Sequence, residues 1–317
     1  MPVSTKVVLI GGYARSGSTL LGQLLGQLPE FVFVGELGAI WDQDFATNRL
    51  CGCGARFNEC PFWTSVVSDL RESDRSFDLE RVRQAQHRVA RWWRVPQLRL
   101  SSRSSPFGKD LAYYRGVLGQ LYASIVRVSR CGVVVDSTKV ASHGFVLARI
   151  NGVALYPIHL VRDSSATAYS LARRKKFNPS DKTYAEGHTL LRAAVGWSGS
   201  NLLAAQLQRV NHNYRLLTYD QLARDPLGAL SSIAGLVGEP SPGPTFLQGS
   251  AARVAATHAL GSNPIKFQTG DIEIRPDDEW RQRMSGIERG FVRFVTWPVE
   301  SYLRRALRDE GTVLARR

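Results

Sequence analysis

The segment that most restricts the fold of this chain lies near its start, where a short apolar run leads into glycines and then into a helical pattern. The run from Val7 to Gly11 is rich in β-branched residues and predicts a buried strand. The apolar spacing from Ser18 to Leu25 predicts a helix. A strand, a glycine loop and a helix in this order are the context of a phosphate-binding loop, because backbone N–H groups and the helix N-terminus together attract an anion.

Short apolar runs alternate with helical patterns through the rest of the chain. The runs that predict further strands cover residues 31–34, 133–135, 155–161 and 214–219. Such alternation is typical of an α/β fold with a central parallel β-sheet flanked by helices. A length of 317 residues suffices for one large domain or two small ones, and we expect a single P-loop-containing domain over residues 1–317. Between the second and third strands we expect a mostly helical insertion, residues 41–130, which binds the acceptor.

Polar clusters follow three of the predicted strands. They are Gly35-Glu36, the segment from Asp136 to Lys139, and the segment from Arg162 to Ser165, after which a helix is predicted from Ala166 to Lys176. In open parallel sheets, ligands bind at the carboxyl ends of the strands. We therefore expect these clusters to surround the binding site.

The glycine loop departs from the loop of nucleotide kinases and ATPases at one position. Its pattern is Gly12-x-x-x-x-Gly17-Ser18-Thr19, with Ser18 where those enzymes carry the lysine that reaches the β- and γ-phosphates. The backbone can still hold an anion, and Arg15 can supply the missing positive charge. The loop thus predicts a bound phosphate but disfavours ATP chemistry.

With these motifs in place, the chain resembles the sulfotransferase family, whose members use 3′-phosphoadenosine-5′-phosphosulfate (PAPS). The stretch from Arg15 to Leu21 resembles the family's loop for the 5′-phosphosulfate. This implies that the 5′ end is bound by Arg15, Ser16, Gly17, Ser18, Thr19 and Leu20. The stretch from Val161 to Ser170 resembles the family's motif for the 3′-phosphate, which implies contacts from Arg162 and Ser170.

Two later segments extend the resemblance. Thr218-Tyr219-Asp220-Gln221-Leu222 is similar to a strand-end segment whose tyrosine lies near the adenine, which implies that role for Tyr219. The segment from Asn263 to Gly270 resembles a loop of bacterial members that closes over the nucleotide, which implies contacts from Asn263, Lys266 and Gly270.

The active-site pattern is nearest to the tyrosylprotein and bacterial carbohydrate branches of the family. Cytosolic steroid and phenol sulfotransferases use a loop lysine and a histidine base, whereas this chain has Arg15 in the loop. The resemblance implies that Glu36 is the general base and that Lys139 and Arg15 neutralise the leaving group, with Ser137 helping to position the nucleotide. The expected reaction is an in-line transfer of the sulfuryl group to a hydroxyl of a small-molecule, carbohydrate or lipid acceptor, releasing 3′-phosphoadenosine-5′-phosphate (PAP), with no metal required.

Three of the four cysteines, Cys51, Cys53 and Cys60, lie close together in the sequence. They could form a zinc knuckle or a redox pair, but the spacing lacks a second Cys-x-x-Cys or a histidine pair. Free thiols in a local turn are therefore the favoured interpretation, and Cys131 is expected to pack in the core. Similar cysteine segments recur in bacterial members of the family.

The net charge leaves two other functions open. Forty-one Lys and Arg residues against 27 Asp and Glu residues give a formal charge of +14 and an isoelectric point near 10.0, which favours polyanionic ligands. A magnesium-dependent kinase is one alternative, because Val133 to Asp136 resembles a Walker B strand. A nucleic-acid-binding protein is the other, supported by the Arg-rich stretches 81–103 and 173–176, although they contain no recognised nucleic-acid module.

The N-terminal segment and the lengths of the apolar runs indicate where the protein is located. The start of the chain lacks the features of a secretory signal, and no run approaches the ~20 apolar residues that cross a bilayer. We therefore expect a cytoplasmic protein without a transmembrane segment or a nucleic-acid partner. A homodimer is compatible with the sequence, which does not set the oligomeric state.

Overall fold

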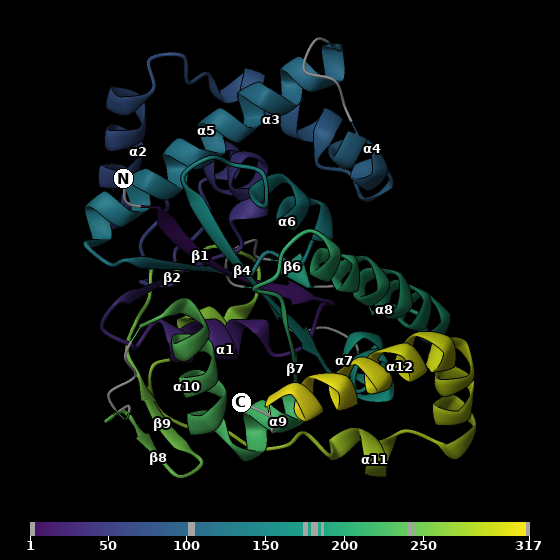
Figure 1. Cartoon of the computed structure of the whole chain (residues 1–317). Coiled ribbons are helices and arrows are strands. Elements are labelled where there is room, and N and C mark those ends of the chain that lie inside the picture. Colours follow the sequence, from purple (N-terminus) through teal and green to yellow (C-terminus); the bar gives the residue numbers. More distant parts are fainter. Residues whose placement is uncertain are drawn as a thin grey trace.

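A computed structural model describes residues 4–100, 105–173, 177–178, 183–184, 187–239, 243 and 245–314. Its centre is a five-stranded sheet in the order β2-β3-β1-β4-β7, in which every neighbouring pair is parallel (Figure 1). The strands are β1 (Thr5–Gly12), β2 (Phe31–Gly35), β3 (Val133–Asp136), β4 (Val153–Val161) and β7 (Arg215–Thr218). The predicted α/β fold is confirmed.

Strand β1 occupies the middle of this sheet because its side chains are apolar on both faces. Val7 and Leu9 belong to one hydrophobic cluster, while Val8 and Ile10 belong to another on the opposite face. All four are at most 1% exposed. A strand buried on both faces needs such a continuous apolar run, which the sequence displays.

Helices cover both faces of the sheet (Figure 1). On one face, α1 (Ser18–Leu25), α9 (Tyr219–Arg224) and α10 (Pro226–Val237) contribute to the cluster of Val8 and Ile10. On the other, α5 (Pro106–Ser129) and α6 (Ala141–Leu147) pack with Val7 and Leu9. Beside the sheet, α7 (Ser164–Ala172), α8 (Leu190–Ala205), η4 (Gln206–Arg209) and α12 (Gly286–Leu314) form the remaining helical layer.

The segment between β2 and β3 is helical, as expected. It contains η1 (Leu37–Ala39), η2 (Ile40–Phe45), α2 (Pro61–Ser73), α3 (Leu79–Val89), η3 (Trp92–Arg94), α4 (Val95–Leu100) and α5. These helices lie over one side of the sheet in Figure 1. The segment begins directly after Glu36, so the end of β2 joins the sheet to the insertion.

The late part of the chain holds a second, antiparallel sheet of β8 (Leu247–Gln248), β9 (Ala251–Val254) and β10 (Gly270–Glu273), with η5 (Pro264–Phe267) between β9 and β10. The segment after β9 crosses the end of β2, where the backbone N–H of Leu260 donates to the carbonyl of Val34 at 2.9 Å. Elsewhere, β5 (Phe177–Asn178) pairs with β6 (Thr183–Tyr184), and α11 (Glu279–Arg283) precedes α12.

Several predicted boundaries differ from the observed ones, and two of the predicted elements end earlier than expected. The strand predicted to reach Tyr219 ends at Thr218, because the Thr218 side chain and Gln221 form a capping box that starts α9. The helix predicted to reach Lys176 ends at Ala172, and residues 174–176 lie outside the described residues. No helix in the described ranges combines the length and the apolar composition needed to cross a membrane.

A buried histidine makes the stability of this fold depend on pH. His159 on β4 is 1% exposed, its Nδ1 lies 2.7 Å from the Tyr214 hydroxyl, and its Nε2 lies 2.8 Å from Asn201 Oδ1. Burial lowers the pKa of His159 to about 4, although the hydrogen bond to Asn201 opposes this shift. The unfolded chain therefore takes up a proton near pH 6.5, whereas the folded protein does so only near pH 4.

We expect the free energy of unfolding to fall by about 3 kcal/mol between pH 7 and pH 4 because of His159. The stabilisation from the neutral His159 is fully present above pH 6.5 and is lost as the pH falls through the folded pKa. Urea unfolding at a series of pH values measures this loss, which His159→Gln should largely remove. The control, His212→Gln, replaces an exposed histidine and should keep the wild-type pH dependence. A His159→Gln variant with an unchanged pH dependence would contradict the assignment.

Candidate active site

The loop between β1 and α1 has the backbone of an anion-binding loop. Gly12, Arg15 and Gly17 have positive φ angles of 131°, 67° and 94°. A Cβ on Gly12 would lie 2.4 Å from the carbonyl oxygen of Leu160, and one on Gly17 would lie 2.6 Å from the ring of Tyr219. Both glycines are therefore required by the close approach of the surrounding chain.

The start of α1 leaves polar groups available to a ligand. No side chain caps its N-terminus and its first turn holds no acidic residue. Ser16 is 2% exposed, and its hydroxyl has no hydrogen-bond partner among the described residues. A buried polar group without a partner is uncommon and calls for an explanation, which an anion in the loop would supply.

Three of the predicted residues meet beside this loop. The Nε of Arg15 donates to the hydroxyl of Ser170 at 3.0 Å, and Nη1 of Arg162 donates to the carbonyl of Arg15 at 2.9 Å. Arg162 leaves the end of β4, and Ser170 lies on α7, whose start is capped by the Asp163 carboxylate accepting from the Ala166 N–H. The strand end and the next helix thus bring the predicted 3′-phosphate residues together.

The charge around Arg15 is unbalanced. Burial, and then the neighbouring guanidinium groups of Arg162 and Arg173, lower the pKa of Arg15 from its ordinary value. Arg162 forms an ion pair with Asp277, which is 43% exposed and opposes the lowering. An added anion would favour the charged form of Arg15 by Coulomb attraction.

Tyr219 contacts both the phosphate loop and Arg162. Its ring is 5.1 Å from the guanidinium of Arg162, its edge restricts Gly17 to glycine, and its hydroxyl donates to the carbonyl of Arg275 at 3.1 Å. The predicted neighbour of the adenine therefore contacts the predicted phosphate residues.

Glu36 and Lys139 form a second group at the ends of β2 and β3. The ammonium of Lys139 donates to a carboxylate oxygen of Glu36, and it also lies 3.5 Å from the carbonyl of Ser137. The Glu36 and Lys139 side chains are 27% and 18% exposed, so both remain accessible. The N–H of Ser137 donates to the carbonyl of Gly35 at 2.7 Å, which joins the two strand ends.

Asp136 has a structural part in this arrangement. Its carboxylate accepts hydrogen bonds from the Tyr122 hydroxyl at 2.5 Å, the His143 ring at 3.0 Å, and the N–H and hydroxyl of Thr138 at 2.8 and 2.6 Å. Burial alone raises its pKa, but the hydrogen bonds from His143, Thr138 and Tyr122 outweigh burial, so the pKa lies below its ordinary value. A carboxylate so occupied is a poor magnesium ligand, which weakens the Walker B interpretation.

The predicted loop from Asn263 to Gly270 is only partly assembled at the site. Asn263 Nδ2 donates to the hydroxyl of Thr19 at 2.9 Å. Lys266 is 1% exposed, and its ammonium instead donates to the carbonyls of Leu50 at 2.6 Å and Gly261 at 2.5 Å. Gly270 begins β10 with a φ of 85° and with open space around its Cα. Of these three residues, the structure brings Asn263 into contact with the phosphate loop.

Several residues around the site were not singled out from the sequence. Asp277 pairs with Arg162, and Gly261 lies against Glu36, since a Cβ on Gly261 would be 3.1 Å from the Glu36 Cγ. Tyr122 and His143 hold Asp136 from two different helices. None of these four residues stands in a recognised sequence motif, so only the three-dimensional arrangement brings them to the site.

A cavity of about 600 Å³ lies away from these residues, within the insertion. It is lined by residues of η2, α2 and their connection, including Phe45, Phe57 and Trp63, and by Leu79 at the start of α3. None of the residues that line it belongs to the phosphate loop, the Arg15 group or the Glu36–Lys139 pair. The cavity is therefore separate from the residues that the sequence assigns to the nucleotide and to catalysis.

Comparisons with known proteins give structural resemblances only. No protein-family model and no curated protein matches the chain significantly. It is similar to the sulfotransferase domain from the curacin biosynthetic pathway, at 17% identity and a TM-score of 0.49, covering 92% of this chain and 96% of that one. It is also similar to the sulfotransferase domain from the Synechococcus PCC 7002 olefin synthase, with 17% identity, a TM-score of 0.48, and coverage of 94% and 93%.

A third solved structure, the sulfotransferase from Alicyclobacillus acidocaldarius, is 14% identical, has a TM-score of 0.45, and covers 95% of each chain. These resemblances assign no function to the chain.

The close approach of Leu260 to Gly35 predicts that a single methyl group at Gly35 strongly destabilises the fold. Gly35 has a φ of 80°, and a Cβ there would lie 2.1 Å from the backbone oxygen of Leu260. Gly35→Ala should lower the free energy of unfolding by about 3 kcal/mol or more, because it adds a backbone clash to the strain of a positive φ. Gly152→Ala has a matching φ of 82° in open space and should cost only about 1 kcal/mol. Equal losses in urea unfolding would contradict the close approach.

Proposed function

We propose that this chain is a sulfotransferase that moves a sulfuryl group from PAPS to a hydroxyl of a small-molecule, carbohydrate or lipid acceptor. The observation that carries the proposal is that a phosphate loop without lysine contacts a second polar group, formed by Arg162 and Ser170. The contacts are the Arg15–Ser170 and Arg162–Arg15 hydrogen bonds. Two neighbouring anion sites suit a nucleotide with separate 3′ and 5′ phosphates, whereas a nucleoside triphosphate carries its phosphates in one row.

Each part of the donor has a place in this arrangement. The 5′-phosphosulfate binds the loop, where the Ser16 hydroxyl and the backbone at the start of α1 donate to it. The loop residues assigned to it are Arg15, Ser16, Gly17, Ser18, Thr19 and Leu20. The 3′-phosphate binds Arg162 and Ser170, and the adenine lies near Tyr219. Asn263 joins its segment to the phosphate loop through the hydrogen bond to Thr19. Lys266 and Gly270 shape the segment from Asn263 to Gly270.

The Glu36–Lys139 pair carries the chemistry. Glu36 takes the proton of the acceptor hydroxyl as that oxygen bonds to sulfur. The bond from sulfur to the bridging oxygen breaks, and its electron pair stays with the 5′-phosphate of PAP. Lys139, released from Glu36 by the arriving donor, neutralises this charge together with Arg15. Because positioning and charge stabilisation dominate such loose transition states, these residues suffice without a metal in the reaction.

The two alternatives account for less of the structure. As a kinase, this chain would lack the loop lysine, because Ser18 stands in its place. It would also need Asp136 to hold magnesium, although protein donors already occupy that carboxylate. Of the basic residues of α3, Arg83 pairs with Asp42 and Glu80, and Arg88 pairs with Asp110, which leaves less charge for nucleic acid. Residues 101–103 and 174–176 of the Arg-rich stretches lie outside the described residues. The cytoplasmic location and the homodimer stay predictions.

The nucleotide part is tested by calorimetry with PAP, AMP and ATP plus magnesium. The wild-type protein should bind PAP best, and Arg162→Ala should weaken PAP binding about 10–100-fold, because it removes a charge-assisted contact to the 3′-phosphate. The same change should affect AMP much less, since AMP has no 3′-phosphate. Arg253→Ala removes an equal charge from a residue with an 82% exposed side chain and should leave all three affinities unchanged.

Equal losses for PAP and AMP would remove Arg162 from the 3′-phosphate. Preference of the wild-type protein for ATP plus magnesium would overturn the proposed donor.

The chemical part is tested on the base. Glu36→Gln should reduce sulfuryl transfer from PAPS to a hydroxyl acceptor by about 10²–10⁴-fold, because the amide cannot take the proton. PAP affinity should change little. Glu30→Gln is the matched control, since Glu30 lies just before β2 whereas Glu36 lies just after it. Turnover by Glu36→Gln close to that of the control would exclude Glu36 as the base.

A further inference from the structure

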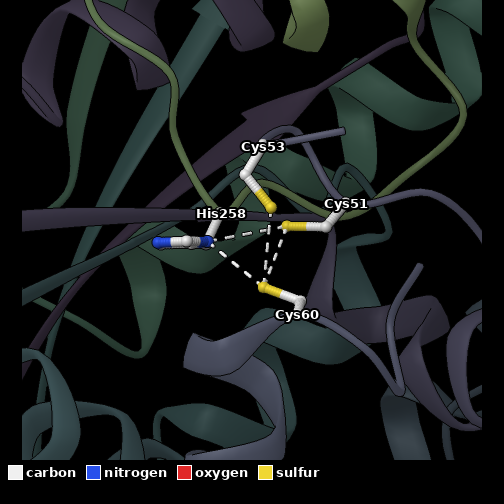
Figure 2. Close-up of side chains that lie close together, drawn as sticks. All are labelled: Cys51, Cys53, Cys60 and His258. Atoms are coloured by element: carbon white, nitrogen blue, oxygen red, sulfur yellow. Dashed lines mark hydrogen bonds between the residues drawn. The ribbon is translucent and has the colours of Figure 1, made fainter. Parts of the chain in front are cut away.

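Three cysteines and one histidine converge outside the proposed active site (Figure 2). Cys51 and Cys53 lie in the turn after η2, Cys60 immediately precedes α2, and His258 comes from the segment that follows β9. Figure 2 shows the three sulfur atoms and the Nδ1 of His258 pointing toward a common centre. All four ligand atoms lie within 4.8 Å of one another.

The separations match a tetrahedral metal site. A zinc ion about 2.3 Å from each sulfur and about 2.0 Å from nitrogen sets tetrahedral sulfurs about 3.8 Å apart, and sulfur and nitrogen about 3.5 Å apart. The Sγ of Cys60 lies 3.6 Å from that of Cys53 and 3.7 Å from that of Cys51. The Nδ1 of His258 lies 3.3 Å from the Cys60 sulfur and 3.8 Å from the Cys51 sulfur.

We propose that Cys51, Cys53, Cys60 and His258 bind one structural Zn²⁺ ion. Three thiolates and one imidazole form a closed set of four ligands, and such soft donors in tetrahedral geometry favour zinc over magnesium or calcium. This assignment replaces the expectation of free thiols. The histidine that completes the site lies almost 200 residues after Cys60 and does not belong to any local pattern.

The surrounding structure supports this ligand set. Gly52 allows the cysteine turn to approach the histidine segment, because a Cβ there would lie 2.6 Å from the backbone oxygen of Thr257. The ring of Phe62 stacks on His258 at 4.7 Å with an interplanar angle of 9°, and the Trp63 indole donates to the His258 carbonyl at 2.9 Å. These contacts fix the ring with its Nδ1 toward the sulfurs, as an ordered ligand requires.

A disulfide accounts for less of this arrangement. It would join two of the three sulfurs at about 2.05 Å, which is far shorter than the separations of Cys60 from both other cysteines. It would also leave the third thiol and His258 without a role. Four donors around one centre are instead what a metal ion needs.

The position of the site suggests what the zinc stabilises, and this step rests on the proposed function. The Gly52 N–H donates to the Ala259 carbonyl at 2.9 Å, next to the histidine ligand. The same segment continues to Gly261, which packs on Glu36, and to Asn263, which binds Thr19. Zinc would therefore fasten the start of the insertion to the loop that positions the base and closes the phosphate site.

The site is tested by elemental mass spectrometry of the full-length protein, purified under reducing conditions after growth with zinc. We expect about one zinc per chain, with loss of the metal in Cys60→Ser and His258→Ala. Cys131→Ser is the matched control, because Cys131 lies outside the cluster, and it should keep the metal. His258→Cys should retain zinc with four thiolates, which separates loss of a ligand from loss of the fold.

Cobalt exchange provides a second readout on the wild-type protein. Co²⁺ bound in place of zinc should give the visible absorption and the thiolate charge-transfer band of a tetrahedral site. Wild-type protein without stoichiometric zinc and without these bands would overturn the site, as would a disulfide between two of its cysteines. Zinc retained by a protein that does not bind PAP would instead contradict the proposed function and leave the site standing.

Discussion

The parallel pairing of β1 with both β3 and β4 is the constraint on which the rest of the structure depends. It aligns Leu9 with Asp136 on one side and Gly12 with Leu160 on the other, so the three strands end at the same edge. The chain can leave β1 at this edge only by a tight turn beneath Leu160, which is why Gly12 has no side chain. The phosphate loop and the polar residues after each strand follow from this alignment.

Electrostatics then divide this edge into two groups. Beside β4, Arg15 and Arg162 lie close together, with burial and mutual repulsion acting against the charge of Arg15. Beside β2, Lys139 and Glu36 neutralise one another. An incoming polyanion is attracted to the first group and can draw Lys139 away from the second, which would free the carboxylate for the acceptor. Binding and activation of the base are thereby coupled in the proposed reaction.

Features of the fold that depend on neighbouring residues in the sequence could be predicted from it. The continuous apolar run of β1 and the alternation of strands with helices predicted the fold class, and the polar residues at the strand ends predicted the edge of the sheet that holds the site. The resemblance to the sulfotransferase family implied that Arg162 and Ser170 lie together.

Two features could not be predicted in this way. One is a contact between residues that are distant in the sequence, and the other is the direction in which a side chain points. The resemblance implies a nucleotide contact for Lys266, yet its ammonium donates to the backbone carbonyls of Leu50 and Gly261. The cysteine cluster lacked a fourth ligand in sequence because His258 arrives through the tertiary fold.

The most direct test of the proposed donor site is a crystal structure of the protein with PAP bound. The 5′-phosphate should lie in the loop between Gly12 and Gly17, the 3′-phosphate should contact Arg162 and Ser170, and the adenine should lie beside Tyr219. The 5′-phosphate should point toward Lys139 and Glu36. A nucleotide bound in the opposite direction, or at a place that leaves Arg15, Arg162 and Ser170 without a phosphate, would contradict the proposed donor site.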